Sequence, residues 1–181
     1  MKGLLIYTNN IEEVEAVGST ALLRRAGLQI VTATFEESKT VKCVYGTNLE
    51  ADYFVNELNL DEFDFLVIPG GSYVVKTYQQ NENMKKLVLD FNNKNKLIAA
   101  ICAGPMFLGE AGILKDKSYT IFPGCQRENF GGKLKQYHKT VTSSNIITAR
   151  SVAAVTLFVN EIVKYLKGYK AAESFLEKIY F

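Results

Sequence analysis

Four short, nearly continuous apolar runs, separated by segments with helical spacing, limit the folds open to this chain. The runs are Gly3–Tyr7, Leu28–Thr34, Phe65–Ile68 and Leu97–Ile101. Runs of this length and composition are typical of strands covered on both faces. Strands that alternate with helices predict an α/β fold with a parallel sheet between helical layers. Ligands of such folds bind at the carboxyl ends of the strands.

Helices are predicted between and after these strands. Ser151–Lys167 gives the clearest pattern, with Ser151 as the predicted N-cap, Val152 on the apolar stripe and Gly168 as the stop signal. The other predicted helices are Ile11–Arg25, Asn83–Phe91 and Tyr169–Phe181. On Ile11–Arg25 the predicted apolar stripe passes through Ile11, Val14, Gly18, Ala21 and Leu22.

Length and composition predict one domain over residues 1–181. The chain is 48% hydrophobic with a net charge of +2, a balance that argues against disorder and gives no basic field for nucleic acid. Its longest uncharged stretch, Leu97–Gly109, is shorter than the roughly 20 residues of a membrane span. No signal peptide is visible. We therefore expect neither a membrane nor a nucleic-acid partner.

The cysteines and the single histidine predict neither a disulfide nor a metal site. Cys43, Cys102 and Cys125 are far apart and odd in number, which argues for free thiols in a reducing cytoplasm. Cys43 fits a structural position in a half-buried edge strand, and Cys125 an exposed loop thiol. His138 lies in a polar stretch and is expected in an exposed loop or hairpin. No metal or cofactor is predicted.

A cysteine follows directly on the strand that ends at Ile101. Ala100 and Gly104 flank Cys102, and Pro105 suits a first helical turn. Small neighbours at a strand-to-helix turn are typical of a nucleophile elbow. A helix N-terminus would lower the pKa of Cys102 and favour the thiolate. The alternative is a small cysteine that fills core space.

Two further features point to the same sheet edge. Gly70 and Gly71 follow the strand Phe65–Ile68, where their amides, with that of Ala103, can stabilise an oxyanion. An ordinary turn is the alternative. Glu15 shares the apolar stripe of its helix, so its carboxyl is either buried with a raised pKa or lies at the edge of the stripe and reaches water.

Together these segments resemble the ThiJ/PfpI family, closest to its Parkinson-disease protein deglycase (DJ-one) branch. The resemblance runs from Met1 to about Gly168. Its motifs are Ile11–Glu15, Leu23–Gly27, Val67–Gly71 and Ala99–Pro105. It implies a flavodoxin-like three-layer sandwich related to class I glutamine amidotransferases. It also implies a homodimer that pairs through the helix around Val17–Arg25, an oxidisable Cys102 with protonated Glu15 as its partner, and a site lined by the amides of Gly71 and Ala103.

The chain departs from the family at three places. The human member of the branch has a histidine where this chain has Phe122, and the protease-like branch has one where this chain has Ala103. Ser151-Val152-Ala153-Ala154 replaces the family's usual Gly-Pro-Gly-Thr. A Cys–His dyad is therefore not expected, and a hydrolase of the amidotransferase or protease type is the weakest hypothesis.

Two functions are left open. One is a cofactor-independent glyoxalase or deglycase, in which Cys102 attacks a small α-oxoaldehyde or a glycated adduct and Glu15 moves protons. The other is a non-enzymatic redox sensor or chaperone, in which Cys102 is oxidised to a sulfinate that Glu15 stabilises. Both need the same reactive sulfur.

Overall fold

The computed structural model describes all of residues 1–181 as an α/β fold built on one seven-stranded sheet. The strands lie in the order β10-β11-β7-β6-β1-β2-β5, and every neighbouring pair is parallel except β10 with β11. The strands of this sheet are β1 (Lys2–Tyr7), β2 (Gln29–Thr34), β5 (Tyr53–Phe54), β6 (Phe65–Ile68), β7 (Leu97–Ile101), β10 (Thr140–Ser143) and β11 (Ile146–Ala149).

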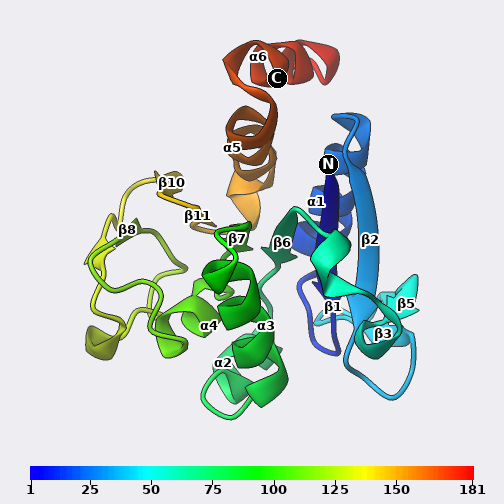
Figure 1. Cartoon of the computed structure of the whole chain (residues 1–181), viewed down its shortest axis with the longest axis vertical. Coiled ribbons are helices and arrows are strands. Elements are labelled where there is room, and N and C mark those ends of the chain that lie inside the picture. The colour runs from blue at the N-terminus through cyan, green and yellow to red at the C-terminus, as the bar shows by residue number, and fades with distance from the viewer.

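The helices form two groups, one on each side of this sheet. On one side α1 packs on α5 and α5 on α6, and on the other α3 packs on α4. Figure 1 shows α5 and α6 at one end of the view and α2, α3 and α4 gathered at the other. The helices are α1 (Glu13–Arg25), α2 (Ser72–Thr77), α3 (Glu82–Asn93), α4 (Pro105–Glu110), α5 (Val155–Lys167) and α6 (Tyr169–Lys178).

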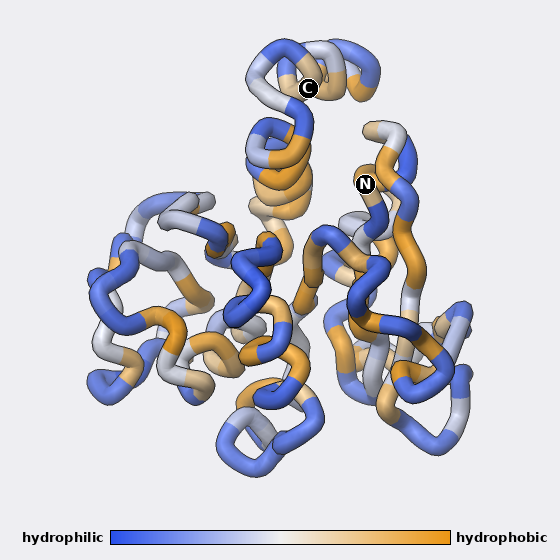
Figure 2. Tube along the Cα trace, viewed as in Figure 1, coloured by the Kyte–Doolittle hydropathy of each residue, from blue (hydrophilic) through white to orange (hydrophobic).

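The four predicted strands and the predicted three-layer α/β arrangement are confirmed. The strands between the helical layers are almost wholly buried, as their continuous apolar composition requires. Figure 2 shows these apolar stretches along the central strands, with hydrophilic residues in the surrounding loops. Two small sheets lie outside: β3 (Thr40–Lys42) with β4 (Asn48–Glu50), and β8 (Ser118–Tyr119) with β9 (Lys133–Leu134). No helix is both long and apolar enough to cross a membrane.

Two details of the helix predictions are wrong. On α1 the predicted apolar stripe does not face the core, because Val14 is 55% exposed and Ala21 is also exposed. Ser151 makes no side-chain cap; a short 3-10 turn, η4 (Val152–Ala154), precedes α5, and Val152 is exposed. The buried face of α1 instead consists of Glu15, Ala16, Ser19, Thr20 and Leu23. Most of these residues are small or polar, so the spacing of hydrophobic residues does not reveal which face of α1 packs on the core.

Candidate active site at the ends of β6 and β7

Cys102 sits on a sharp turn between β7 and α4. Its φ is 62°, a left-handed conformation that is unfavourable for a residue with a side chain, by about 1–2 kcal/mol. Two backbone hydrogen bonds hold the turn: the Cys102 N–H donates to the Ala149 carbonyl, and its own carbonyl accepts the Phe122 N–H, both at 2.9 Å. The predicted nucleophile elbow is present, and its side chain is half-buried rather than enclosed in the core.

Glu15 is fully buried, 0% exposed, in the first turn of α1. Its Oε2 accepts the Gly70 N–H at 2.8 Å, and the Gly70 carbonyl accepts the Glu12 N–H at 3.1 Å. These reciprocal bonds fasten the start of α1 to the end of β6. Oε1 is buried and has no partner in hydrogen-bond geometry. Of the two readings the sequence left open, the buried carboxyl is therefore correct.

Burial raises the pKa of Glu15 from 4.5 to about 7. The neighbouring Cys102 thiol and the hydrogen bond from the Gly70 N–H act in the opposite direction, and the Glu12 charge adds a smaller rise. The carboxyl therefore keeps its proton below neutral pH. A group that holds a proton near pH 7 is suited to give and take protons in a reaction.

The predicted lowering of the Cys102 pKa is wrong. Burial raises the pKa of the thiol, and the charge of the neighbouring Glu15 carboxylate raises it further, against a smaller opposing effect of the Ala103 N–H. Helix α4, which begins at Pro105, is only six residues long and does not outweigh these effects. Because the two groups interact strongly, they titrate as a pair, and the pair loses its first proton near pH 7.

The three glycine and alanine amides predicted to line the site have different roles. The Gly70 N–H is used by Glu15 and is not free for an oxyanion. The N–H groups of Gly71 and Ala103 donate to no backbone carbonyl. Gly71 has a φ of 129°, and a Cβ there would lie 2.3 Å from the Asn10 carbonyl, so only glycine fits. The Ala103 N–H lowers the pKa of the Cys102 thiol, by less than burial and Glu15 raise it.

A cavity of about 440 Å³ opens over these groups. Glu15, Gly71, Cys102 and Ala103 line it, and Cys125 also faces it. Four exposed apolar side chains from separate segments line it as well: Tyr45, Val75, Phe122 and Val152. The cavity is large enough for a small substrate, and its apolar rim with a few polar groups is typical of ligand sites.

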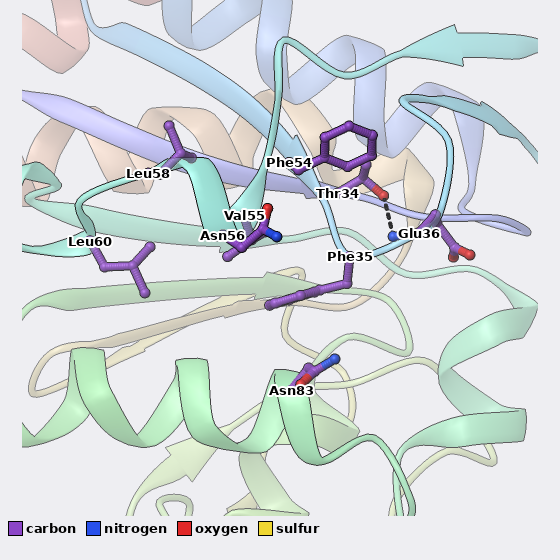
Figure 3. A pocket seen from close by; sticks show the side chains of 9 residues that line it. All are labelled: Thr34, Phe35, Glu36, Phe54, Val55, Asn56, Leu58, Leu60 and Asn83. Atoms are coloured by element: carbon purple, nitrogen blue, oxygen red, sulfur yellow. Dashed lines mark hydrogen bonds between the residues drawn. The ribbon is translucent and has the colours of Figure 1, made fainter.

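A separate cavity of about 480 Å³ lies beside the end of β2 (Figure 3). Phe35, Leu58 and Leu60 are among its lining residues, and the Glu36 N–H donates to Thr34 Oγ1 at 3.1 Å. The Glu36 carboxylate is already engaged by the Thr8 hydroxyl and by the Asn9 N–H. No cysteine lines this cavity, and the hydroxyl of Thr34 accepts the Glu36 N–H, so we place the candidate site at Cys102.

The remaining predicted residues lie in different places. His138 is exposed, as expected, and lines none of the cavities described above. Cys43 is buried, just after β3, in agreement with a structural position. The prediction that Cys125 is an exposed thiol is wrong: it is 7% exposed and faces the Cys102 cavity. No group of three or more His, Cys, Asp or Glu side chains is arranged to hold a metal ion.

Comparison with known proteins shows the family of the chain. The sequence matches the DJ-1/PfpI family over residues 1–165. The chain belongs to the DJ-1/PfpI family. A deglycase of Pyrococcus horikoshii is 29% identical over 92% of this chain and 100% of its own length. Drosophila melanogaster protein dj-1beta is 29% identical over 91% of this chain and 89% of its own.

Solved structures of the family share the fold. The crystal structure of Drosophila melanogaster DJ-1beta superposes with a TM-score of 0.90 at 26% identity, covering 98% of this chain and 96% of that one. An oxidised DJ-1 of Toxoplasma gondii gives a TM-score of 0.88 at 24% identity, over 99% and 98% of the two chains. The predicted family and fold class are confirmed.

Proposed function

We propose that this protein is a cysteine-dependent, stress-protective enzyme that acts on α-oxoaldehydes or their adducts through Cys102 and Glu15. The observation that carries the proposal is the buried Glu15 carboxyl, with a pKa of about 7, beside the thiol on the strained turn. The deglycase names of family relatives give it support from outside the structure.

The reactive form is the pair that has lost one proton. In this form the remaining proton lies either on sulfur, with Glu15 as carboxylate, or on Glu15, with Cys102 as thiolate. The second arrangement provides a nucleophile and an acid side by side. No histidine is needed for this step, since Glu15 accepts the thiol proton directly.

The thiolate then attacks the aldehyde carbon of a substrate such as methylglyoxal, and a carbon–sulfur bond forms as the carbonyl π bond opens. The oxygen becomes an alkoxide that the N–H groups of Gly71 and Ala103 stabilise, and Glu15 protonates it to a hemithioacetal. Glu15 next removes the proton from the former aldehyde carbon, which gives an enediolate. The hydroxyl proton on that carbon passes to the neighbouring oxygen, and Glu15 returns its proton to the neighbouring carbon. The resulting thioester reacts with water, which releases lactate and the free thiol.

Lactate production from methylglyoxal by the purified protein tests this function. Cys102→Ala is expected to abolish the activity, and Glu15→Gln, which keeps the shape but cannot exchange protons, to lower it by about 10²–10⁴-fold. Cys43→Ala is the matched control, because Cys43 lies outside the cavity. Activity that survives in Cys102→Ala would exclude this mechanism.

The second function, a redox sensor, rests on the same buried acid. A protonated Glu15 can donate a charge-assisted hydrogen bond to a sulfinate on Cys102. Intact-mass analysis after mild peroxide tests whether oxidation is confined to Cys102. Added oxygen distributed over all three cysteines would argue against it.

We also propose a homodimer in a reducing, cytoplasmic setting. The outward face of α1 presents Val14, 55% exposed, and Val17, 42% exposed, beside Ala21. An apolar face on a helix that also carries Glu15 suits contact with a second copy. Size-exclusion chromatography of Val17→Glu tests the dimer, since a charge on this face should shift the protein to a monomer. All three cysteines are free, as a reducing compartment requires.

A further inference from the structure

Two of the three cysteines face one cavity. Cys102 is half-buried and Cys125 is buried, and both line the 440 Å³ cavity beside Phe122. A charge on Cys125 is close enough to raise the pKa of Cys102, whereas no such effect comes from Cys43. The mechanism above uses Cys102 and leaves Cys125 without a role.

Backbone hydrogen bonds link the two cysteine segments. The Phe122 N–H donates to the Cys102 carbonyl at 2.9 Å, and the Cys125 N–H donates to the Phe122 carbonyl at 3.0 Å. The turn from Phe122 to Cys125 is thus held against the nucleophile elbow, although the two cysteines are 23 positions apart in the sequence (125 − 102).

The turn that carries Cys125 is held mainly by its own residues. Arg127 Nη1 donates to the carbonyls of Gly124 and Gln126, both at 2.8 Å, and the Gly124 N–H donates to the Gln126 side chain at 2.9 Å. Pro123 and Gly124 are exposed, and the space around the Gly124 Cα is open. None of these three bonds joins the turn to a strand of the sheet. Burial raises the pKa of Cys125, and the Arg127 charge opposes this rise without reversing it.

We propose that Cys125 is the resolving cysteine of Cys102: a peroxide oxidises Cys102 to a sulfenic acid, and Cys125 converts that acid into an intramolecular disulfide. The proposal rests on the reactivity of Cys102 in the proposed function. The proposal adds a second residue, Cys125, to the redox chemistry of Cys102. Its product is a disulfide that thiols can reduce, whereas the sulfinate of the redox-sensor hypothesis is not reduced by thiols.

The two steps balance with a peroxide as the oxidant. First, the Cys102 thiolate attacks one peroxide oxygen; an S–O bond forms, the O–O bond breaks, and the departing hydroxide takes the Glu15 proton and leaves as water. The sulfur loses two electrons and the peroxide gains them. Second, the Cys125 thiolate attacks the Cys102 sulfur; an S–S bond forms, the S–O bond breaks, and hydroxide leaves and is protonated by solvent.

Peptide mapping after treatment with an excess of hydrogen peroxide tests the proposal, because the disulfide consumes one peroxide per chain and the sulfinate consumes two. Each cysteine lies on its own tryptic peptide: Cys43–Lys76, Leu97–Lys115 and Ser118–Arg127. The expected product is a cross-link between the last two peptides, with the loss of two hydrogens, which dithiothreitol reverses. Cys125→Ala should lose the cross-link and accumulate roughly tenfold more Cys102 sulfinate than the wild type. Cys43→Ala should behave like the wild type, and thermal melts check that the variants are folded.

The other outcomes separate this proposal from the one on which it rests. If the wild type and Cys125→Ala give the same sulfinate at Cys102 and no cross-link, Cys125 does not resolve, while Cys102 remains reactive. If Cys102 resists the peroxide in both proteins and also resists alkylation, the proposed reactivity and the resolving role are both overturned.

Discussion

The Glu15 carboxyl and the Gly70 amide are joined by a buried 2.8 Å hydrogen bond that ties the start of α1 to the end of β6. This bond uses Oε2 and leaves Oε1 buried without a partner in hydrogen-bond geometry, at the cavity that contains the Cys102 sulfur. The carboxyl is thus fixed in position but still has one free oxygen. An acid held in this way can exchange its proton with only one neighbour, the thiol or whatever the thiol binds.

The shared proton sets the pH dependence of Cys102. Below pH 7 the pair holds both protons and is unreactive, and it loses one as the pH rises through the Glu15 pKa of about 7. We expect two rates to rise about tenfold per pH unit below pH 7 and to level off above it: the rate of alkylation by iodoacetamide and kcat/KM for methylglyoxal. In Glu15→Gln the inflection should move away from 7. A wild-type rate that stays flat from pH 5 to 8 would contradict the shared proton.

The same carboxyl links stability to pH. Its pKa rises from 4.5 to about 7 on folding, so the folded state holds this proton more tightly than the unfolded chain. The contribution is therefore fully present below pH 4.5 and is lost as the pH rises through 7. Between pH 5 and 8, Glu15 should lower the free energy of unfolding by roughly 2–3 kcal/mol.

Urea unfolding of the wild type and Glu15→Gln at pH 5 and 8 measures this contribution. The variant carries no titrating group at this position, so its free energy of unfolding should fall less between the two pH values, by roughly 2–3 kcal/mol. Other titrating groups are common to both proteins and cancel in the comparison. Equal pH slopes in the two proteins would show that Glu15 is ionised in the folded state at pH 5.

Gly70 leaves no room for a side chain. A Cβ there would lie 2.8 Å from the Cys102 Cβ and 2.8 Å from Glu15 Oε2. Gly70→Ala should therefore separate the acid from the sulfur, with a loss of at least tenfold in Cys102 alkylation rate at pH 7.5 and a destabilisation of about 1–3 kcal/mol.

Gly109→Ala is the matched control for this prediction. A Cβ at Gly109 would meet the Phe130 ring at 2.3 Å, in the core of the α4 region rather than at the site. It should destabilise the protein by a similar amount and leave the alkylation rate of the folded protein unchanged. If both variants alkylate at the wild-type rate, Gly70 does not hold the pair together.

Much of this site could be predicted from the sequence, because strand ends and turn residues leave local signals. Cys102 follows a continuous apolar strand and precedes Gly104 and Pro105, and a pattern of this kind depends only on neighbours in the chain. The glycine pair after β6 carries a similar local signal. Both features lie where the rule for parallel sheets places a ligand site.

The sequence could not predict properties that depend on distant partners. Glu15 is held in a buried position by its hydrogen bond with Gly70, 55 positions away. The buried face of α1 contains several polar residues, so a pattern of apolar residues does not identify it. Cys125 was predicted to be exposed because its loop is polar and contains Gly124, yet the turn folds its thiol into the cavity. The pKa of Cys102 was predicted in the wrong direction, because a local helix effect is weaker than burial and a nearby carboxylate.

The side chain of Phe122 is 45% exposed and lines the Cys102 cavity, at the position where the family resemblance implies a histidine. Its backbone N–H already holds the elbow, so a change of side chain leaves that bond in place. Phe122→His adds a group that exchanges protons near neutral pH and can help Glu15 in the hydrolysis step. We expect kcat for methylglyoxal to rise about 10-fold or more, with the alkylation rate of Cys102 unchanged. Phe122→Leu is the control for the loss of side-chain volume and should not raise kcat. An equal rise in kcat in both variants would show that access to the cavity, and not proton transfer, limits turnover.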